Sequence, residues 1–185
     1  MIGVHVKNWD EKDELGHCLA DRELFETRKL SEALKIDLLE LECIENYWNF
    51  IFDPFIQNRS KNLGFPIDQY CNSKIKFSEM LKKAREKTEF DYFATGHYAQ
   101  TVRHQNFTFM TQAEDQNKDQ TFYLSNLSED QISQALFPIG HLNKNVVKSI
   151  AIKNGLSDWA LKKESQGICF VGKKRNMGRD NFCRV

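Results

Sequence analysis

The chain has 185 residues, enough for one domain with a buried core. Its 26 basic and 26 acidic residues give a formal net charge of zero, so any nucleic-acid binding requires a local basic patch. A hydrophobic content of 41% with 28% charged residues excludes a disordered chain, and no apolar run reaches the length of a membrane span. The five cysteines show no CxxC spacing, which fits a reducing compartment and gives no metal-site pattern.

The first half of the chain alternates strands and helices. Residues Met1–Val6 alternate apolar and polar side chains like a half-buried strand, and helical spacing predicts a surface helix over Ala20–Lys35. Further strands are predicted at Ile36–Cys43 and Phe90–Thr95. This alternation favours a parallel α/β sheet, in which ligands bind beyond the carboxyl ends of the strands.

Two helical patterns lie between these strands. An aromatic stripe over residues 47–56 indicates core packing rather than a ligand-binding box, and Pro54 is expected to kink or shorten that helix. A second helix is predicted over Ile75–Lys87, preceded by a polar loop at Asn58–Gly64.

The second half is predicted to be helical, after a short strand at Phe107–Met110. Ser128 with Gln131 forms a capping-box pattern ahead of a helix that reaches about Leu136. A later helix over Lys144–Asn154 ends at Gly155, as expected for a glycine at this position.

Two cysteines carry potential thiol chemistry. Cys71 follows Asp68 by three residues and precedes Lys74 and Lys76, which are expected at a helix start. Cations and a helix N-terminus lower a thiol pKa, although a buried structural cysteine is the alternative. Cys169 follows two lysines in a Ser- and Gly-flanked loop, and the same two interpretations apply to it.

Two further segments carry polar groups suited to a ligand. In Gly96-His97-Tyr98, glycine permits close approach of a ligand to the backbone and His97 can donate or accept a proton; a structural histidine is the alternative. The loop Asn117–Gln120 suits contact with phosphate or ribose, or is a solvated turn. Because no GxxxxGK[ST] or GxGxxG motif is present, the residues alone support only a thiol-based function.

Taken together, eight strings along the chain resemble the tRNA-specific 2-thiouridylases, enzymes with an ATP-pyrophosphatase-type domain. In chain order they are KNWD (Lys7–Asp10), CLADRE (Cys18–Glu23), YWNFIF (Tyr47–Phe52), DQYCNSKIKF (Asp68–Phe77), ATGHYA (Ala94–Ala99), NKDQTFYLS (Asn117–Ser125), LFPIG (Leu136–Gly140) and the segment Lys162–Asn176.

The resemblance implies ATP-dependent sulfur transfer to C2 of the wobble uridine of tRNA through a cysteine persulfide. Cys169 would receive the persulfide, Cys71 would release its sulfur or form a disulfide with Cys169, and Asp68 would act as acid and base. The implied contacts with the target base are Pro66, Ile67 and Asp68. The resemblance further implies that Val6 and Gly96 contact ATP, which acts with Mg²⁺. The implied contacts with tRNA are His97, Lys118, Asp119 and Gln120.

The same resemblance predicts the organisation of the chain. Residues 1–125 would form an incomplete nucleotide-binding α/β domain, a partial Rossmann-like sheet without the first strand and its SGGVDSS-type phosphate loop. Residues 126–185 would form a helical continuation that ends in the persulfide-cysteine loop, without the family's β-rich C-terminal domains. Thiolation by the isolated chain is therefore not expected.

The resemblance also implies partners and a location. A sulfur-donor protein, either a cysteine desulfurase or a relay protein, would act with the chain, and no membrane is involved. The location would be mitochondrial, or cytoplasmic in a bacterium. Two alternatives remain: a non-catalytic fragment that binds tRNA or the sulfur donor, and a thiol-redox protein that uses Cys71 and Cys169.

Overall fold

The computed structural model describes residues 1–10 and 19–162, which fall into two compact units. Residues 1–10 and 19–44 lie in the first unit, and residues 45–162 lie in the second. The division predicted between residues 125 and 126 stays a prediction. None of the helices in the described ranges is long and apolar enough to cross a lipid bilayer.

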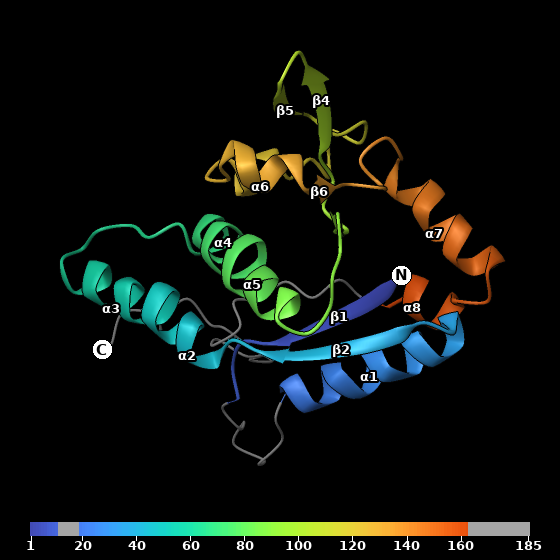
Figure 1. Cartoon of the computed structure of the whole chain (residues 1–185), viewed down its shortest axis with the longest axis horizontal. Coiled ribbons are helices and arrows are strands. Elements are labelled where there is room, and N and C mark those ends of the chain that lie inside the picture. Colours follow the sequence, from blue (N-terminus) through green and yellow to red (C-terminus); the bar gives the residue numbers. More distant parts are fainter. Residues whose placement is uncertain (11–18, 163–185) are drawn as a thin grey trace. The chain divides into compact units, whose positions relative to one another are not determined.

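The first unit is a parallel pair of strands with one helix beside it. β1 (Ile2–Lys7), α1 (Leu19–Leu34) and β2 (Asp37–Glu42) follow one another, and the two strands pair residue by residue along their whole length. Figure 1 shows α1 running alongside both strands. The strand–helix–strand pattern predicted for residues 1–43 is confirmed.

Polar contacts hold α1 against the strands. The guanidinium of Arg28 donates to both carboxylate oxygens of Glu40 on β2, at 2.7 and 2.8 Å. This hydrogen bond lowers the pKa of the Glu40 carboxyl below its usual value. The Thr27 hydroxyl lies 3.3 Å from Nδ1 of His5 on β1, so the helix contacts each strand through a side chain.

A continuous helical run that contains a wide turn lies in the second unit, except for its first residue, Ile44. It consists of α2 (Ile44–Tyr47), the π-helical segment η1 (Trp48–Phe52) and α3 (Asp53–Ser60). Pro54 is the second residue of α3 and follows directly on η1, where the Asp53 N–H bonds to the Trp48 carbonyl five residues earlier. The run continues past Pro54 instead of being shortened there, and it extends into the segment predicted as a loop from residue 58.

A second helical run carries the central sequence string. It consists of α4 (Ile67–Tyr70), the π-helical segment η2 (Cys71–Glu79) and α5 (Met80–Arg85). The predicted start at Ile75 was therefore wrong, since the helix begins eight residues earlier, immediately after Pro66. Cys71 consequently lies within the helix and not in the loop before it.

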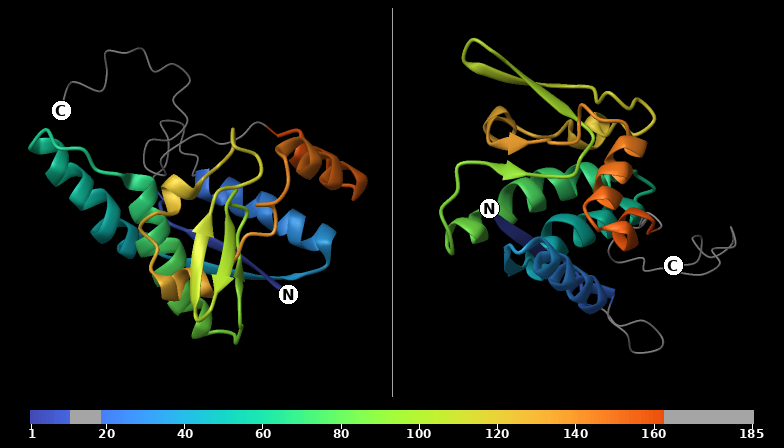
Figure 2. Two further views of the ribbon diagram at one scale, coloured as in Figure 1. Left: turned by 90° about the horizontal axis from the view of Figure 1, so that it is seen from above. Right: turned by 90° about the vertical axis from the view of Figure 1, so that its right-hand side faces the viewer.

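The remaining strands form two small sheets in the second unit. β3 (Phe93–Ala94) pairs in parallel with β6 (Ala135–Leu136), and β4 (Gln100–His104) pairs antiparallel with β5 (Phe107–Thr111). Figure 2 shows β4 and β5 as a hairpin. Gln105, in the turn between the two strands, has a φ of 53°, in the left-handed region. The helix predicted to reach about Leu136 is present but ends at Ser133, because Ala135 and Leu136 form a strand. The predicted strand Phe90–Thr95 is real but reduced to two residues.

Four short or medium helices complete the second unit. They are η3 (Thr121–Leu124), α6 (Glu129–Ser133), α7 (Lys144–Lys153) and α8 (Ser157–Ala160). The predicted capping box at the start of α6 is present, and Gly155 after α7 has a φ of 77°, which favours glycine.

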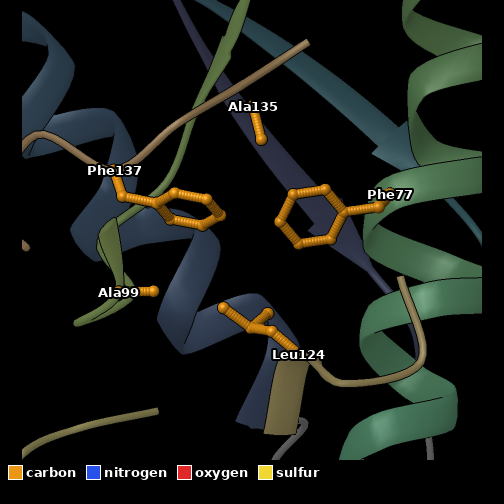
Figure 3. Packing of buried hydrophobic residues seen from close by; sticks show 5 residues of the cluster. All are labelled: Phe77, Ala99, Leu124, Ala135 and Phe137. Atoms are coloured by element: carbon orange, nitrogen blue, oxygen red, sulfur yellow. The ribbon is translucent and has the colours of Figure 1, made fainter. Parts of the chain in front are cut away.

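The core of the second unit joins these elements. Figure 3 shows the rings of Phe77 from η2 and Phe137 facing each other among small or aliphatic neighbours. The complete buried cluster is Phe77, Ala99, Leu124, Ala135 and Phe137. Because its members come from four separate segments, this cluster fixes η2, η3 and the β3–β6 pair relative to one another.

Candidate functional site

The carboxylate and thiol predicted for catalysis lie on adjacent turns of one helix. Asp68 is exposed in the first turn of α4, and the Cys71 thiol is buried, with 9% of the residue exposed. The backbone N–H of Cys71 donates to the carbonyl groups of Ile67 and Asp68. Cys71 therefore does not lie at an open helix N-terminus, which corrects the environment predicted for this thiol.

The two lysines after Cys71 point to different surroundings. Lys74 is exposed and lines a polar pocket, and Lys76 is close enough to His97 to lower the pKa of that imidazole. The two lysines therefore lie in different surroundings, Lys74 in the pocket lining and Lys76 near His97.

Side chains next to Asp68 and Cys71 connect this helix to η3. The amide of Gln69 donates to the carbonyl oxygen of Phe122 at 3.0 Å, and the amide of Asn72 donates to that of Tyr123 at 2.9 Å. These bonds span more than 50 residues of sequence. The helix that carries the candidate catalytic pair is thus fixed to the segment that follows the predicted tRNA loop.

Side-chain hydrogen bonds stabilise the loop Asn117–Gln120, which is predicted to contact tRNA. Asp119 accepts hydrogen bonds from the Ala113 backbone N–H at 2.8 Å and from the Thr121 hydroxyl at 2.6 Å. The Gln120 side-chain oxygen accepts from the Tyr98 N–H at 3.0 Å, and the Gln120 N–H donates to the Tyr98 carbonyl at 2.8 Å. Two of the predicted contact residues therefore use their side chains to shape the loop and to join it to residue 98.

Gly96 and His97 differ in their exposure. Gly96 is exposed, and a Cβ atom placed on it would have no neighbour within 4 Å, so its backbone is open to a ligand. The His97 ring lies near the rings of Phe77 and Phe137, with Nδ1 2.9 Å from the Thr95 hydroxyl. Burial, with a smaller effect from Lys76, lowers the pKa of His97 to about 4, so the imidazole is neutral at pH 7.

Three of the four predicted groups come together in the second unit. The Asp68–Cys71 helix contacts the loop through η3, and the loop contacts Gly96-His97-Tyr98 through Gln120. Val6 is half-buried on β1 in the first unit, and Cys169 lies outside the described residues. The roles assigned to all of these residues stay predictions.

The open backbone at Gly96 fits the predicted contact with ATP. Across residues 1–10 and 19–162, no group of three or more His, Cys, Asp and Glu side chains could hold a metal ion.

Sequence reasoning missed three amides that assemble the site. Gln69 and Asn72 lie in the same string as Asp68 and Cys71, so their position in that string was the available signal. Gln131 was expected only as a helix cap, yet its amide also bonds to carbonyl groups of η2. A one-dimensional pattern contains no information on this second partner.

The comparisons with known proteins agree with the motifs. The chain is 39% identical over 175 residues to the tRNA-specific 2-thiouridylase MnmA of Lactobacillus helveticus, and 40% identical to those of Streptococcus thermophilus and Streptococcus pyogenes. Each alignment covers 94% of this chain and 46% of the relative, so the chain spans about half the length of the curated relatives it matches.

A family match covers most of the chain and agrees with the observed elements. The family is described as the tRNA methyl transferase HUP domain, and it matches residues 1–173. A HUP domain is a Rossmann-like α/β fold, so the predicted fold class is confirmed, as is the resemblance to 2-thiouridylases. The chain belongs to the tRNA methyl transferase HUP domain family.

Proposed function

We propose that this chain contributes the sulfur-transfer site of a tRNA 2-thiouridylase. The observation that carries the proposal is the placement of exposed Asp68 and buried Cys71 about one helical turn apart on the same helix. Hydrogen bonds from Gln69 and Asn72 fix this helix to η3. A carboxylate open to solvent can exchange a proton with a base, and a thiol under cover is protected from unspecific oxidation.

In this proposal each residue of the pair has one role. Asp68 takes or gives the proton at the target uridine, with Pro66 and Ile67 against the base. The Cys71 thiolate attacks the inner sulfur of a persulfide on Cys169, which forms a Cys71–Cys169 disulfide and releases hydrosulfide as the sulfur nucleophile. A reducing thiol must then cleave that disulfide before the next cycle.

ATP, when bound, supplies the adenylation that turns the C2 oxygen of uridine into a leaving group. Gly96 would accommodate it, because the space beside its backbone is open. Val6 is the second proposed contact, and Mg²⁺ would accompany the nucleotide. A cysteine desulfurase or a relay protein would supply the sulfur.

The alternative is a non-catalytic module that binds tRNA or the sulfur donor. One observation favours it: all seven candidate tRNA-binding residues lie in the second unit, in segments joined by hydrogen bonds. RNA binding by this unit would then be independent of the nucleotide contact proposed on β1.

One assay separates these functions. The chain is incubated with tRNA, ATP, Mg²⁺, a cysteine desulfurase and cysteine. The Cys71–Cys169 disulfide is measured by peptide mass spectrometry alongside 2-thiouridine, with Cys71→Ser as the control. A disulfide that forms in the wild type and is absent from Cys71→Ser supports the catalytic proposal, even where the isolated chain makes no 2-thiouridine. Specific tRNA binding without the disulfide supports the alternative, and the absence of both contradicts the two proposals.

A further inference from the structure

A polar pocket lies beside the candidate catalytic helix, on a different set of side chains from Asp68 and Cys71. It has a volume of about 500 Å³ and is formed by one side of α4–η2 and by the start of α6 with the residues before it. Its lining residues are Tyr70, Ser73, Lys74, Ser78, Asn126, Ser128 and Gln131. All of them belong to the second unit.

The charge of the lining selects the ligand class. Among the residues that the structure describes, Lys74 is the single charged one in the lining, and the others carry hydroxyl or amide groups. No carboxylate of residues 1–10 or 19–162 lines the pocket, so its electrostatic potential favours an anion with several hydrogen-bond acceptors.

Two of the lining residues, Ser73 and Gln131, make hydrogen bonds that hold the helices around the pocket in place. The Gln131 amide donates to the carbonyl groups of Ser73 and Phe77, each at 2.9 Å, and the Ser73 hydroxyl donates to the Gln69 carbonyl at 2.9 Å. These bonds hold α6 and η2 together, so the pocket is formed before any ligand enters.

Other lining residues retain donors for a ligand. Within the described part of the chain, no hydrogen bond or ion pair engages the side chains of Lys74, Ser78 or Asn126. An ammonium, a hydroxyl and an amide together match the oxygens of a phosphate and of an adjoining ribose.

We propose that this pocket binds a phosphate group of the RNA backbone, with Lys74 as its cationic contact; this inference rests on the proposed function. Lys74 follows Cys71 by three residues and Asp68 by six in one continuous helical run. Six helical residues rise at most about 9 Å, so a nucleotide that neighbours the target base reaches the pocket. A volume of about 500 Å³ holds a phosphate with its flanking ribose rather than the anion alone.

The test measures tRNA binding by the full chain at several salt concentrations. Each phosphate neutralised by a lysine adds about one to the magnitude of the slope of log K against log salt. Lys74→Ala should weaken binding by about threefold to tenfold at low salt and reduce that slope by about one. Lys74→Arg should restore the wild-type slope, because it keeps the charge.

Lys87→Ala is the matched control. Lys87 is exposed near the end of the same helical run but does not line the pocket, so this variant makes the same change in net charge. If Lys74→Ala and Lys87→Ala alter the slope equally, the pocket has no specific role and the proposal is wrong.

A second arm separates RNA from free phosphate. Phosphorus NMR line widths of inorganic phosphate are recorded with the wild type and with Lys74→Ala. Phosphate binding that depends on Lys74, without any change in the salt slope for tRNA, overturns the assignment to RNA. A wild-type chain that binds no tRNA overturns both this inference and the RNA part of the proposed function. Absent thiolation with the expected slope change leaves the pocket inference standing.

Discussion

The side-chain amide of Gln131 donates to the carbonyl oxygen of Ser73 at 2.9 Å, although the two residues are 58 positions apart in the sequence. The same nitrogen donates to the carbonyl of Phe77 at 2.9 Å, and the amide oxygen accepts from the Ser128 N–H at 3.0 Å. One side chain thus caps α6 and bridges two successive turns of η2. The helix that carries Cys71 is held by this amide as well as by its own backbone bonds.

Replacing Gln131 should destabilise the chain. Gln131→Ala leaves two carbonyl groups of η2 without their donor, which should lower the free energy of unfolding by about 2–3 kcal/mol. Gln131→Glu should cost more at neutral pH, because a carboxylate cannot donate to a carbonyl and repels it. Urea denaturation measures both.

The control for this prediction is Ser128→Ala, which removes only the hydroxyl that accepts the Gln131 backbone N–H. Loss of that cap should cost about 1 kcal/mol. A Gln131→Ala variant no less stable than Ser128→Ala would show that the bridge to η2 contributes nothing.

Gln131 also shows what the sequence could and could not predict. The Ser-x-x-Gln spacing reveals the cap because both partners lie in one turn, whereas the bridge to η2 depends on tertiary packing. The strand–helix–strand unit at residues 1–43 was predictable for the same reason, since its apolar periodicity is local. β6 was not, because its two residues become a strand only by pairing with distant β3.

The start of the Cys71 helix was missed for a physical reason. Residues Ile67–Lys74 show little apolar periodicity, since Gln69 and Asn72 make hydrogen bonds to η3 instead of packing in a core. The residue types of the site were predictable from the strings, but their arrangement was not. In particular, no local pattern indicates that both carboxylate oxygens of Asp119 accept hydrogen bonds from nearby residues, Ala113 and Thr121.

Gly140 should not tolerate a side chain. A Cβ atom at this position would lie 1.7 Å from the Ala99 carbonyl oxygen, and the Gly140 carbonyl accepts from the Glu114 N–H at 2.9 Å. Gly140→Ala must therefore push apart two backbone segments next to the buried cluster. We expect a loss of about 3 kcal/mol or more, measured as a lower Tm.

Gly64→Ala is the comparison for Gly140. Gly64 is exposed, and its added Cβ would meet nothing within 4 Å, so this variant should melt within about 2 °C of the wild type. Equal melting of the two alanine variants would mean that the close approach at residue 99 relaxes without cost.

His97 should make stability depend on pH. The folded chain keeps the imidazole neutral to a pKa of about 4, whereas the unfolded chain takes up a proton near pH 6.5. Protonation therefore favours unfolding: the stability is complete above pH 6.5 and is lost as the pH falls towards 4. The difference amounts to about 3 kcal/mol over this window.

His97→Phe tests this dependence, because phenylalanine keeps a ring beside Phe77 and Phe137 but has no titratable nitrogen. The stability difference between wild type and variant should shift with pH, while the other titrating groups, His5 included, cancel. A difference that stays constant between pH 7 and 4 contradicts the assigned pKa.

Cys71 should be protected from thiol reagents in the folded chain. Its residue is 9% exposed, so iodoacetamide should modify it about tenfold or more slowly in buffer than in urea, as followed by peptide mass spectrometry. Asn72 holds the adjacent backbone to η3 through the Tyr123 carbonyl, so Asn72→Ala should raise the native rate by loosening this cover. The proposed sulfur transfer through Cys71 would require the same local opening, and the alkylation rate measures how often that opening occurs. Equal rates in buffer and urea would instead mean that the thiol is reached without any opening.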